Sequence, residues 1–286
     1  MPVSEWSAIV AGAETHWWEY GDPASPVTLV TVHGFRGDHH GLEPVVARLE
    51  DLRIVSPDLP GFGRSGPLPE RHTVESYADW LIAFVGRVRE ATATPIAVLG
   101  HSFGSIVVAA ALERGLAPDR VILVNPIAAP ALEGPKGALS RMTLGFYRLA
   151  GALPEPLGRA LLASPAIVRF MSVAMTKTRD RRLRRWIHEE HDRYFSAFAT
   201  RESVIEGFEA SISDNVAGHV AAFTMPTLLI GAAQDQITSV ADLRALHVAM
   251  PRSELVIFDG VGHLIHYERP AEAAHAIRAH LAPLAE

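Results

Sequence analysis

The sequence predicts an α/β fold with a mostly parallel central sheet flanked by helices. Apolar runs of strand length alternate with helical patterns in residues 27–124 and 227–281, as in sheets whose strands are joined by helical crossovers. Residues 96–108 combine an apolar strand, a Gly-x-Ser-x-Gly turn and an Ala-rich apolar helix. The 286 residues, 48% of them hydrophobic, are enough to bury a large core.

The expected elements follow one another in a regular order. Two short strands are expected within residues 8–20, joined near Gly12. The other expected strands, short runs of apolar residues, are residues 27–32, 53–56, 96–100, 120–124, 227–230 and 254–258. The expected helices are about residues 42–49, a helix that Thr73 caps and that ends near Glu90, the stretch after Ser102, residues 240–250, and a last helix that Pro270 opens.

The alternation stops between about residues 129 and 221. That segment shows only helical patterns, interrupted by prolines such as Pro154 and Pro165. Ligands of mostly parallel sheets bind at the carboxyl ends of the strands, so a helical insertion on this side is expected to be a lid. We therefore expect a first core part in residues 1–128, a helical lid in residues 129–221 between the sixth and seventh strands, and a second core part in residues 222–286.

Composition excludes several classes of function. The net charge of −6 does not favour nucleic acid or an anionic membrane surface as a partner. The absence of cysteine excludes disulfides, thiolate nucleophiles and Cys-metal sites. Neither a signal peptide nor a transmembrane segment is expected, so we expect a cytoplasmic protein that acts on a small molecule. The oligomeric state is left open.

Ser102 is the expected nucleophile. It is the central residue of Gly100-His101-Ser102-Phe103-Gly104, which joins an apolar strand to an apolar helix. Such a tight turn forces φ of the serine above zero, and side chains two residues to either side would collide, which suits Gly100 and Gly104. The turn is expected to lift the Ser102 hydroxyl clear of the sheet.

A serine hydroxyl needs a base to accept its proton and a third group to orient that base. Asp235 follows the expected strand 227–230, and His263 follows the expected strand 254–258. Both are therefore expected beside Ser102. Asp259 is expected to serve a turn, and the end of the strand 120–124 carries Asn125 and no carboxylate.

Two other groups of residues complete the expected site. Acyl transfer develops negative charge on an oxygen, which two backbone N–H groups can stabilise; the N–H groups of Phe35, in His33-Gly34-Phe35, and of Phe103 are the expected donors. The other histidines are expected at the surface or in packing. His39 and His40 beside Asp38 have no matching ligand cluster, so neither a metal nor a cofactor is expected.

The sequence resembles the serine-nucleophile branch of the α/β-hydrolase fold superfamily. The resemblance rests on His33-Gly34-Phe35, on the loop of residues 58–65, on the turn around Ser102, and on Asp235 and His263 in that chain order. Ser102 differs from the aspartate nucleophile of dehalogenases and epoxide hydrolases. Two departures are Arg36, where epoxide hydrolases have proline, and Ser105, in place of a second glycine.

The resemblance implies an esterase-like enzyme with a Ser102–His263–Asp235 catalytic triad. A carbon–carbon bond hydrolase or lyase acting on an acidic keto or dienoic acid is the alternative, and a binding or signalling protein on the same scaffold is a third. Arg36 and the arginine-rich residues 178–187 distinguish the two enzyme classes. An arginine that binds a substrate carboxylate would favour the carbon–carbon bond hydrolase or lyase over the esterase. Possible substrate-binding residues are Arg36, His33 and Gly34.

Overall fold

The centre of the molecule is one sheet of eight strands. The computed structural model describes residues 1–130 and 137–285, in which the strand order is β1-β2-β4-β3-β5-β6-β7-β8. β2 pairs antiparallel with β1 and β4, and the other pairings are parallel. The strands are β1 (Val3–Val10), β2 (Ala13–Tyr20), β3 (Thr28–Val32), β4 (Arg53–Pro57), β5 (Ile96–His101), β6 (Arg120–Val124), β7 (Thr227–Ala232) and β8 (Ser253–Phe258). The predicted mostly parallel sheet is confirmed.

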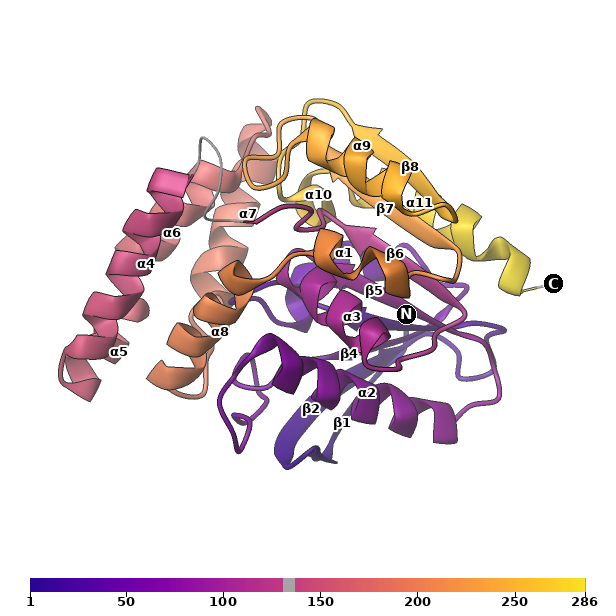
Figure 1. The fold of residues 1–286 in the computed structure, drawn as a ribbon, viewed down its shortest axis with the longest axis horizontal. Coiled ribbons are helices and arrows are strands. Elements are labelled where there is room, and N and C mark those ends of the chain that lie inside the picture. Colours follow the sequence, from indigo (N-terminus) through magenta and orange to yellow (C-terminus); the bar gives the residue numbers. More distant parts are fainter. Residues whose placement is uncertain (131–136, 286) are drawn as a thin grey trace.

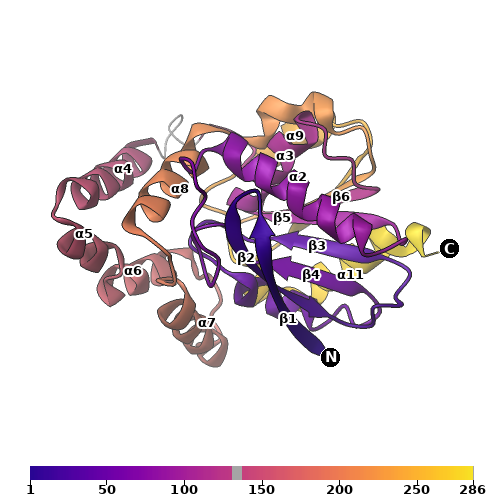
Figure 2. The same ribbon diagram turned by 90° about the horizontal axis from the view of Figure 1, so that it is seen from below.

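Helices cover both faces of this sheet (Figures 1 and 2). The core on one face includes side chains of α2 (Val74–Glu90), α3 (Phe103–Glu113) and α9 (Val240–Ala249). The core on the other face includes side chains of α1 (Glu43–Val46), α10 (Ile265–Glu268) and α11 (Pro270–Leu281). The short 3-10 helices η1 (His39–Leu42) and η3 (Ala282–Leu284) precede α1 and follow α11.

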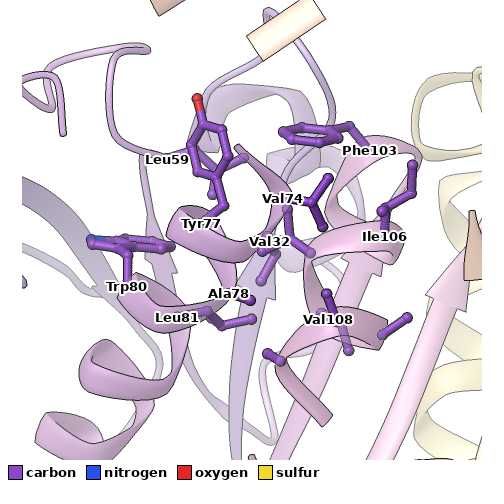
Figure 3. Close-up of a cluster of buried hydrophobic side chains, with 14 of the residues drawn as sticks. Val32, Leu59, Val74, Tyr77, Ala78, Trp80, Leu81, Phe103, Ile106 and Val108 are labelled. Atoms are coloured by element: carbon purple, nitrogen blue, oxygen red, sulfur yellow. The ribbon is translucent and has the colours of Figure 1, made fainter. Parts of the chain in front are cut away.

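Helix α2 packs against α3 on one face of the sheet. Figure 3 shows Tyr77 of α2 and Phe103 of α3 in one cluster with Val32 of the sheet. Thr73 caps α2 as predicted, accepting the Ser76 N–H. Each fully buried large side chain in such a cluster stabilises the fold by about 1.5–3 kcal/mol.

Two expected elements have different bounds. The first strand begins at Val3 rather than near Ala8, because residues 3–7 pair in register with residues 16–20. The helix expected over residues 42–49 is α1, which ends at Val46. Beyond it, the N–H groups of Arg48 and Leu49 donate to carbonyls three residues back, at 3.0 and 2.9 Å, so the chain tightens and leaves the α-helix.

A helical insertion separates β6 from β7 along the chain and lies to one side of the sheet (Figures 1 and 2). Residues 131–136 of the range expected for a lid lie outside the described residues. The elements of this insertion are α4 (Gly137–Ala152), α5 (Glu155–Leu162), α6 (Pro165–Met175), α7 (Arg181–Tyr194), α8 (Arg201–Ser213) and η2 (Val216–Ala222).

One stretch among the described residues, Glu155–Met175, is long and apolar enough to cross a membrane. Length and composition are weak grounds for such a span. The stretch is also interrupted, since α5 ends at Leu162 and α6 begins at Pro165.

Buried histidines are a further feature of the core. Burial lowers the pKa of His101 to about 3 and that of His191 to about 4. Burial also places the pKa of His33 and of His266 below the ordinary value. All four rings are therefore neutral in the folded protein near neutral pH.

These rings predict a loss of stability in mild acid. Below pH 6.5 the unfolded chain binds more protons at these histidines than the folded chain does, so the free energy of unfolding falls as pH decreases. Each such group contributes a slope of roughly 1 kcal/mol per pH unit. Urea unfolding between pH 8 and about pH 5 at constant ionic strength measures the total slope.

The control for this prediction is His191→Gln, which removes one of the four groups and should flatten the slope. His40 and His219, whose carboxylate partners outweigh partial burial and raise their pKa, act in the opposite direction. Stability that stays constant or rises between pH 7 and about pH 5 would contradict the assignment of neutral rings.

Candidate active site

Ser102 lies in a strained turn between β5 and α3. Its φ is 53° and its ψ is −119°, a conformation that costs a non-glycine residue about 1–3 kcal/mol. A Cβ at Gly100 would lie 2.6 Å from the Gly104 carbonyl oxygen, and one at Gly104 would lie 2.3 Å from the Val32 carbonyl oxygen. Both positions therefore require glycine. The Ser102 N–H donates to the Val124 carbonyl at 3.0 Å, which fixes the turn against β6.

Loops after β7 and β8 bring two side chains to this serine. His263 Nε2 lies 2.8 Å from Ser102 Oγ, and His263 Nδ1 lies 2.9 Å from Asp235 Oδ2. Because a carboxylate only accepts hydrogen bonds, the Nδ1–H donates to Asp235 and leaves Nε2 free to accept the Ser102 proton. The arrangement can convert a hydroxyl into a nucleophile.

Asp235 is held in its ionised form. Its carboxylate is 1% exposed, and burial alone would raise its pKa. The pKa of Asp235 is nevertheless lowered. The His263 ring attracts the carboxylate when it is protonated and donates a hydrogen bond to it, and the Ile237 N–H and the Asn125 amide donate two more. A buried negative charge in this position can stabilise an imidazolium formed by proton transfer from a hydroxyl.

Asn125 is a part of the site that sequence reasoning missed. It follows β6 with φ of 47°, in the left-handed region that asparagine tolerates better than most residues. Its Nδ2 donates to Asp235 Oδ2 at 2.8 Å and to the Gly262 carbonyl at 3.4 Å. The signal is an asparagine at the end of a central strand, a position at which sequence reasoning sought only a carboxylate.

The loop 33–35 packs directly against Ser102. A Cβ at Gly34 would lie 3.2 Å from Ser102 Cβ. His33 Nε2 accepts the Leu59 N–H at 2.8 Å, so its Nδ1 carries the proton and donates to the Gly34 carbonyl at 2.9 Å. Both ring nitrogens of His33 thus bond to the backbone and shape the loop rather than face a ligand.

The two expected oxyanion donors occupy suitable elements. Phe103 is the first residue of α3, so its N–H has no carbonyl partner within its own helix. Phe35 adjoins Gly34, and its ring packs against Phe62, Tyr147 and Phe208 with centroids 5.7–5.9 Å apart. The Phe35 ring therefore joins the loop to the insertion, while the preceding residue, Gly34, packs against Ser102.

Arg36 ties this loop to the insertion. The residue is 1% exposed, with φ of 60°. Its Nη2 donates to the Leu162 carbonyl at 2.8 Å, its Nε to the Phe195 carbonyl at 3.1 Å, and its Nη1 to the Tyr147 hydroxyl at 3.4 Å. These three partners carry no formal charge. The guanidinium is thus a buried cation that connects three helical segments of the insertion to the loop.

The exposed arginines of α7 differ from Arg36. Arg181, Arg182, Arg184 and Arg185 are all exposed. This part of the arginine-rich run is a solvated helix surface.

His39 and His40 have partners of their own. Their ligand atoms and that of Asp38 lie within 4.8 Å of one another, but His39 Nδ1 bonds to Asp58 at 2.8 Å and His40 Nδ1 to Asp38 at 3.2 Å. The His39 ring also stacks on the Trp18 ring, with the ring centroids 3.3 Å apart. These contacts account for the group as packing and loop capping.

The Arg36 contacts predict that Arg36→Met loosens the insertion. Methionine keeps much of the length but leaves two buried carbonyls without their donors, at about 1–3 kcal/mol each. Limited proteolysis with mass spectrometry should show faster cleavage within residues 137–222. Arg159→Met is the matched control. It also removes a guanidinium that bonds to two carbonyls, but those carbonyls, of Phe198 and Ala199, lie inside the insertion, so the contact between the loop and the insertion stays intact. Equal cleavage rates for wild type and Arg36→Met would contradict the anchoring role.

Comparisons with known proteins identify the family of the chain. The sequence model described as "Alpha/beta hydrolase family" matches residues 29–276. The chain is 25% identical over 243 residues to "Putative carbamate hydrolase RutD" of Klebsiella pneumoniae, with 84% of this chain and 85% of that protein covered.

Solved structures share the fold. An esterase from Thermogutta terrifontis has a TM-score of 0.78 at 21% identity, covering 99% of this chain and 100% of its own. An esterase from Exiguobacterium antarcticum has a TM-score of 0.78 at 15% identity, covering 96% and 98%. The family match runs from β3 into α11 and so includes every strand of the parallel part of the sheet, which shows that the chain belongs to the α/β-hydrolase family.

Proposed function

We propose that this hydrolase cleaves a carboxylic ester, or a related acyl bond, of a mainly apolar small molecule, with Ser102 as nucleophile, His263 as base and Asp235 as orienting acid. The observation that carries the proposal is the continuous hydrogen-bonded chain from Ser102 Oγ through His263 to Asp235 Oδ2, with distances of 2.8 and 2.9 Å. The esterases that share the fold are compatible with it.

The proposed reaction has two steps. His263 accepts the Ser102 proton as Oγ attacks the carbonyl carbon, and the Phe35 and Phe103 N–H groups stabilise the oxyanion. His263 then protonates the leaving alcohol, and the acyl group stays on Ser102. Water attacks this acyl-enzyme with His263 again as base, which releases the acid and restores Ser102.

The surroundings of His263 support this cycle. His101 lies 5.6 Å from His263, ring centroid to ring centroid, and His266 lies 4.2 Å from His101. Burial lowers the pKa of both neighbours, so neither adds a positive charge that would oppose the imidazolium. Asp235 supplies the charge that favours it.

Arg36 and α7 favour an apolar over an acidic substrate. The Arg36 nitrogens bond to groups of the insertion, and the named α7 arginines are exposed. The insertion would act as a lid. Two of its aromatic side chains, Phe195 and Phe198, lie next to Arg36 and would supply apolar surface. A carbon–carbon hydrolase for acidic keto acids is therefore the less supported alternative. Carbamates stay within the proposal because one relative is described as "Putative carbamate hydrolase RutD", and amides stay within it as related acyl compounds.

The first test is hydrolysis of a chromogenic ester series of increasing acyl length, with aryl carbamates and anilides alongside. We expect turnover with an optimum in acyl length. Ser102→Ala should lower kcat on the order of 10⁴- to 10⁶-fold, and Ser211→Ala, in α8, should leave it unchanged. Near-normal activity of Ser102→Ala would remove Ser102 from the nucleophile role. No turnover by folded wild type on any series would shift the function to carbon–carbon cleavage or to binding.

Asn125 provides a second test. Asn125→Gly accommodates the positive φ and removes the amide donor to Asp235, so Asp235 should bind a proton more readily. The acidic limb of the pH profile of kcat/KM should move to higher pH, and kcat should fall about tenfold, the equivalent of one lost charge-assisted hydrogen bond. An unchanged pH profile would show that the amide does not position Asp235.

A further inference from the structure

The first strand leaves one side of its backbone unpaired. β1 stands at one end of the strand order, beside β2 and opposite β8, and Figure 2 shows it at the sheet edge. Among the described strands it pairs with β2 alone, over eight residues from Val3 to Val10. Edge strands of this length present N–H and C=O groups that another strand can bond.

β1 lacks the features that usually protect an edge strand. Its sequence, VSEWSAIV, contains neither lysine nor proline. Its one charged residue, Glu5, is paired within the chain with Arg64 and lies 3.5 Å from His16. Three large apolar side chains are exposed on this strand: Val3 is 56%, Trp6 53% and Ile9 67% exposed. β8, the other edge, is half-buried along most of its length.

We propose that β1 pairs antiparallel with β1 of a second copy of the chain, so that two sheets join across a twofold axis. Such an interface is isologous, and each copy contributes the same surface. Backbone hydrogen bonds would supply part of its affinity, and side chains on the two faces of the junction would supply the rest.

The side chains select one register. With the axis at Trp6, Trp6 faces the partner's Trp6, Val3 faces the partner's Ile9, and Glu5 faces the partner's Ser7. All three exposed apolar residues then meet apolar residues, on both faces of the sheet, because Val3 and Ile9 share one face and Trp6 lies on the other. Moving the axis to Glu5 would place two like charges opposite each other, which is unfavourable. The strand is therefore self-complementary around Trp6.

Sedimentation velocity of the full chain over a wide concentration range tests the proposal, with any affinity tag at the C-terminus. We expect a concentration-dependent dimer. Ile9→Lys and Trp6→Lys should weaken dimerisation by roughly tenfold or more. Val248→Lys is the matched control, because Val248 is 81% exposed on α9. A wild-type chain that sediments as a monomer throughout would overturn the proposal, as would a dimer that both β1 variants leave intact.

Cross-linking tests the register, because the chain has no cysteine of its own. The Trp6 axis places Ser4 opposite the partner's Ala8, so a mixture of Ser4→Cys and Ala8→Cys chains should form a disulfide-linked heterodimer under mild oxidation. Either variant alone should not, because its two cysteines would be about 13 Å apart along the strands. Cross-linking of the mixture no faster than Val248→Cys alone would exclude this pairing. These readouts do not depend on catalysis, so they remain valid if the proposed function fails.

Discussion

The site depends on one constraint, the close approach of backbone around Ser102. A Cβ at Gly100 would clash with the Gly104 carbonyl oxygen, and a Cβ at Gly104 would clash with the Val32 carbonyl oxygen of β3. This approach holds φ of Ser102 at 53°, and the resulting direction of Oγ allows His263 to reach it from the loop after β8. The same contact packs α3 onto β3 and β5, so the core and the candidate nucleophile share one structural requirement.

Burial then separates the charge states around the site. Asp235 is buried but surrounded by donors, so it is ionised. His33, His101 and His266 are buried without comparable compensation, so they are neutral. The negative charge of Asp235 therefore lies beside His263, and the neighbouring histidine rings carry no charge.

Much of this arrangement follows from local sequence. Ser102, Asp235 and His263 could be placed together because each follows an apolar strand, and parallel strands end at one edge of the sheet. The cap at Thr73 was equally predictable from the sequence. The early start of β1 could not be predicted, because residues 3–7 are mostly polar or exposed and are ordered as a strand by pairing with β2. The roles of Asn125 and Arg36 were not predicted either, because only a carboxylate was sought at the end of β6 and nothing local to Arg36 indicates which carbonyl groups of the insertion its side chain reaches.

The uncharged partners of Arg36 have a consequence for how the insertion can separate from the core. Removing an ion from water costs several kcal/mol, and neutral carbonyl groups return only part of that cost. If the insertion moves away from the loop, the guanidinium recovers its hydration, which offsets part of the free energy needed to break its hydrogen bonds to Tyr147 and Phe195. Separation of the insertion from the loop therefore requires less free energy than the loss of the three Arg36 hydrogen bonds would require by itself, because rehydration of the guanidinium returns part of it.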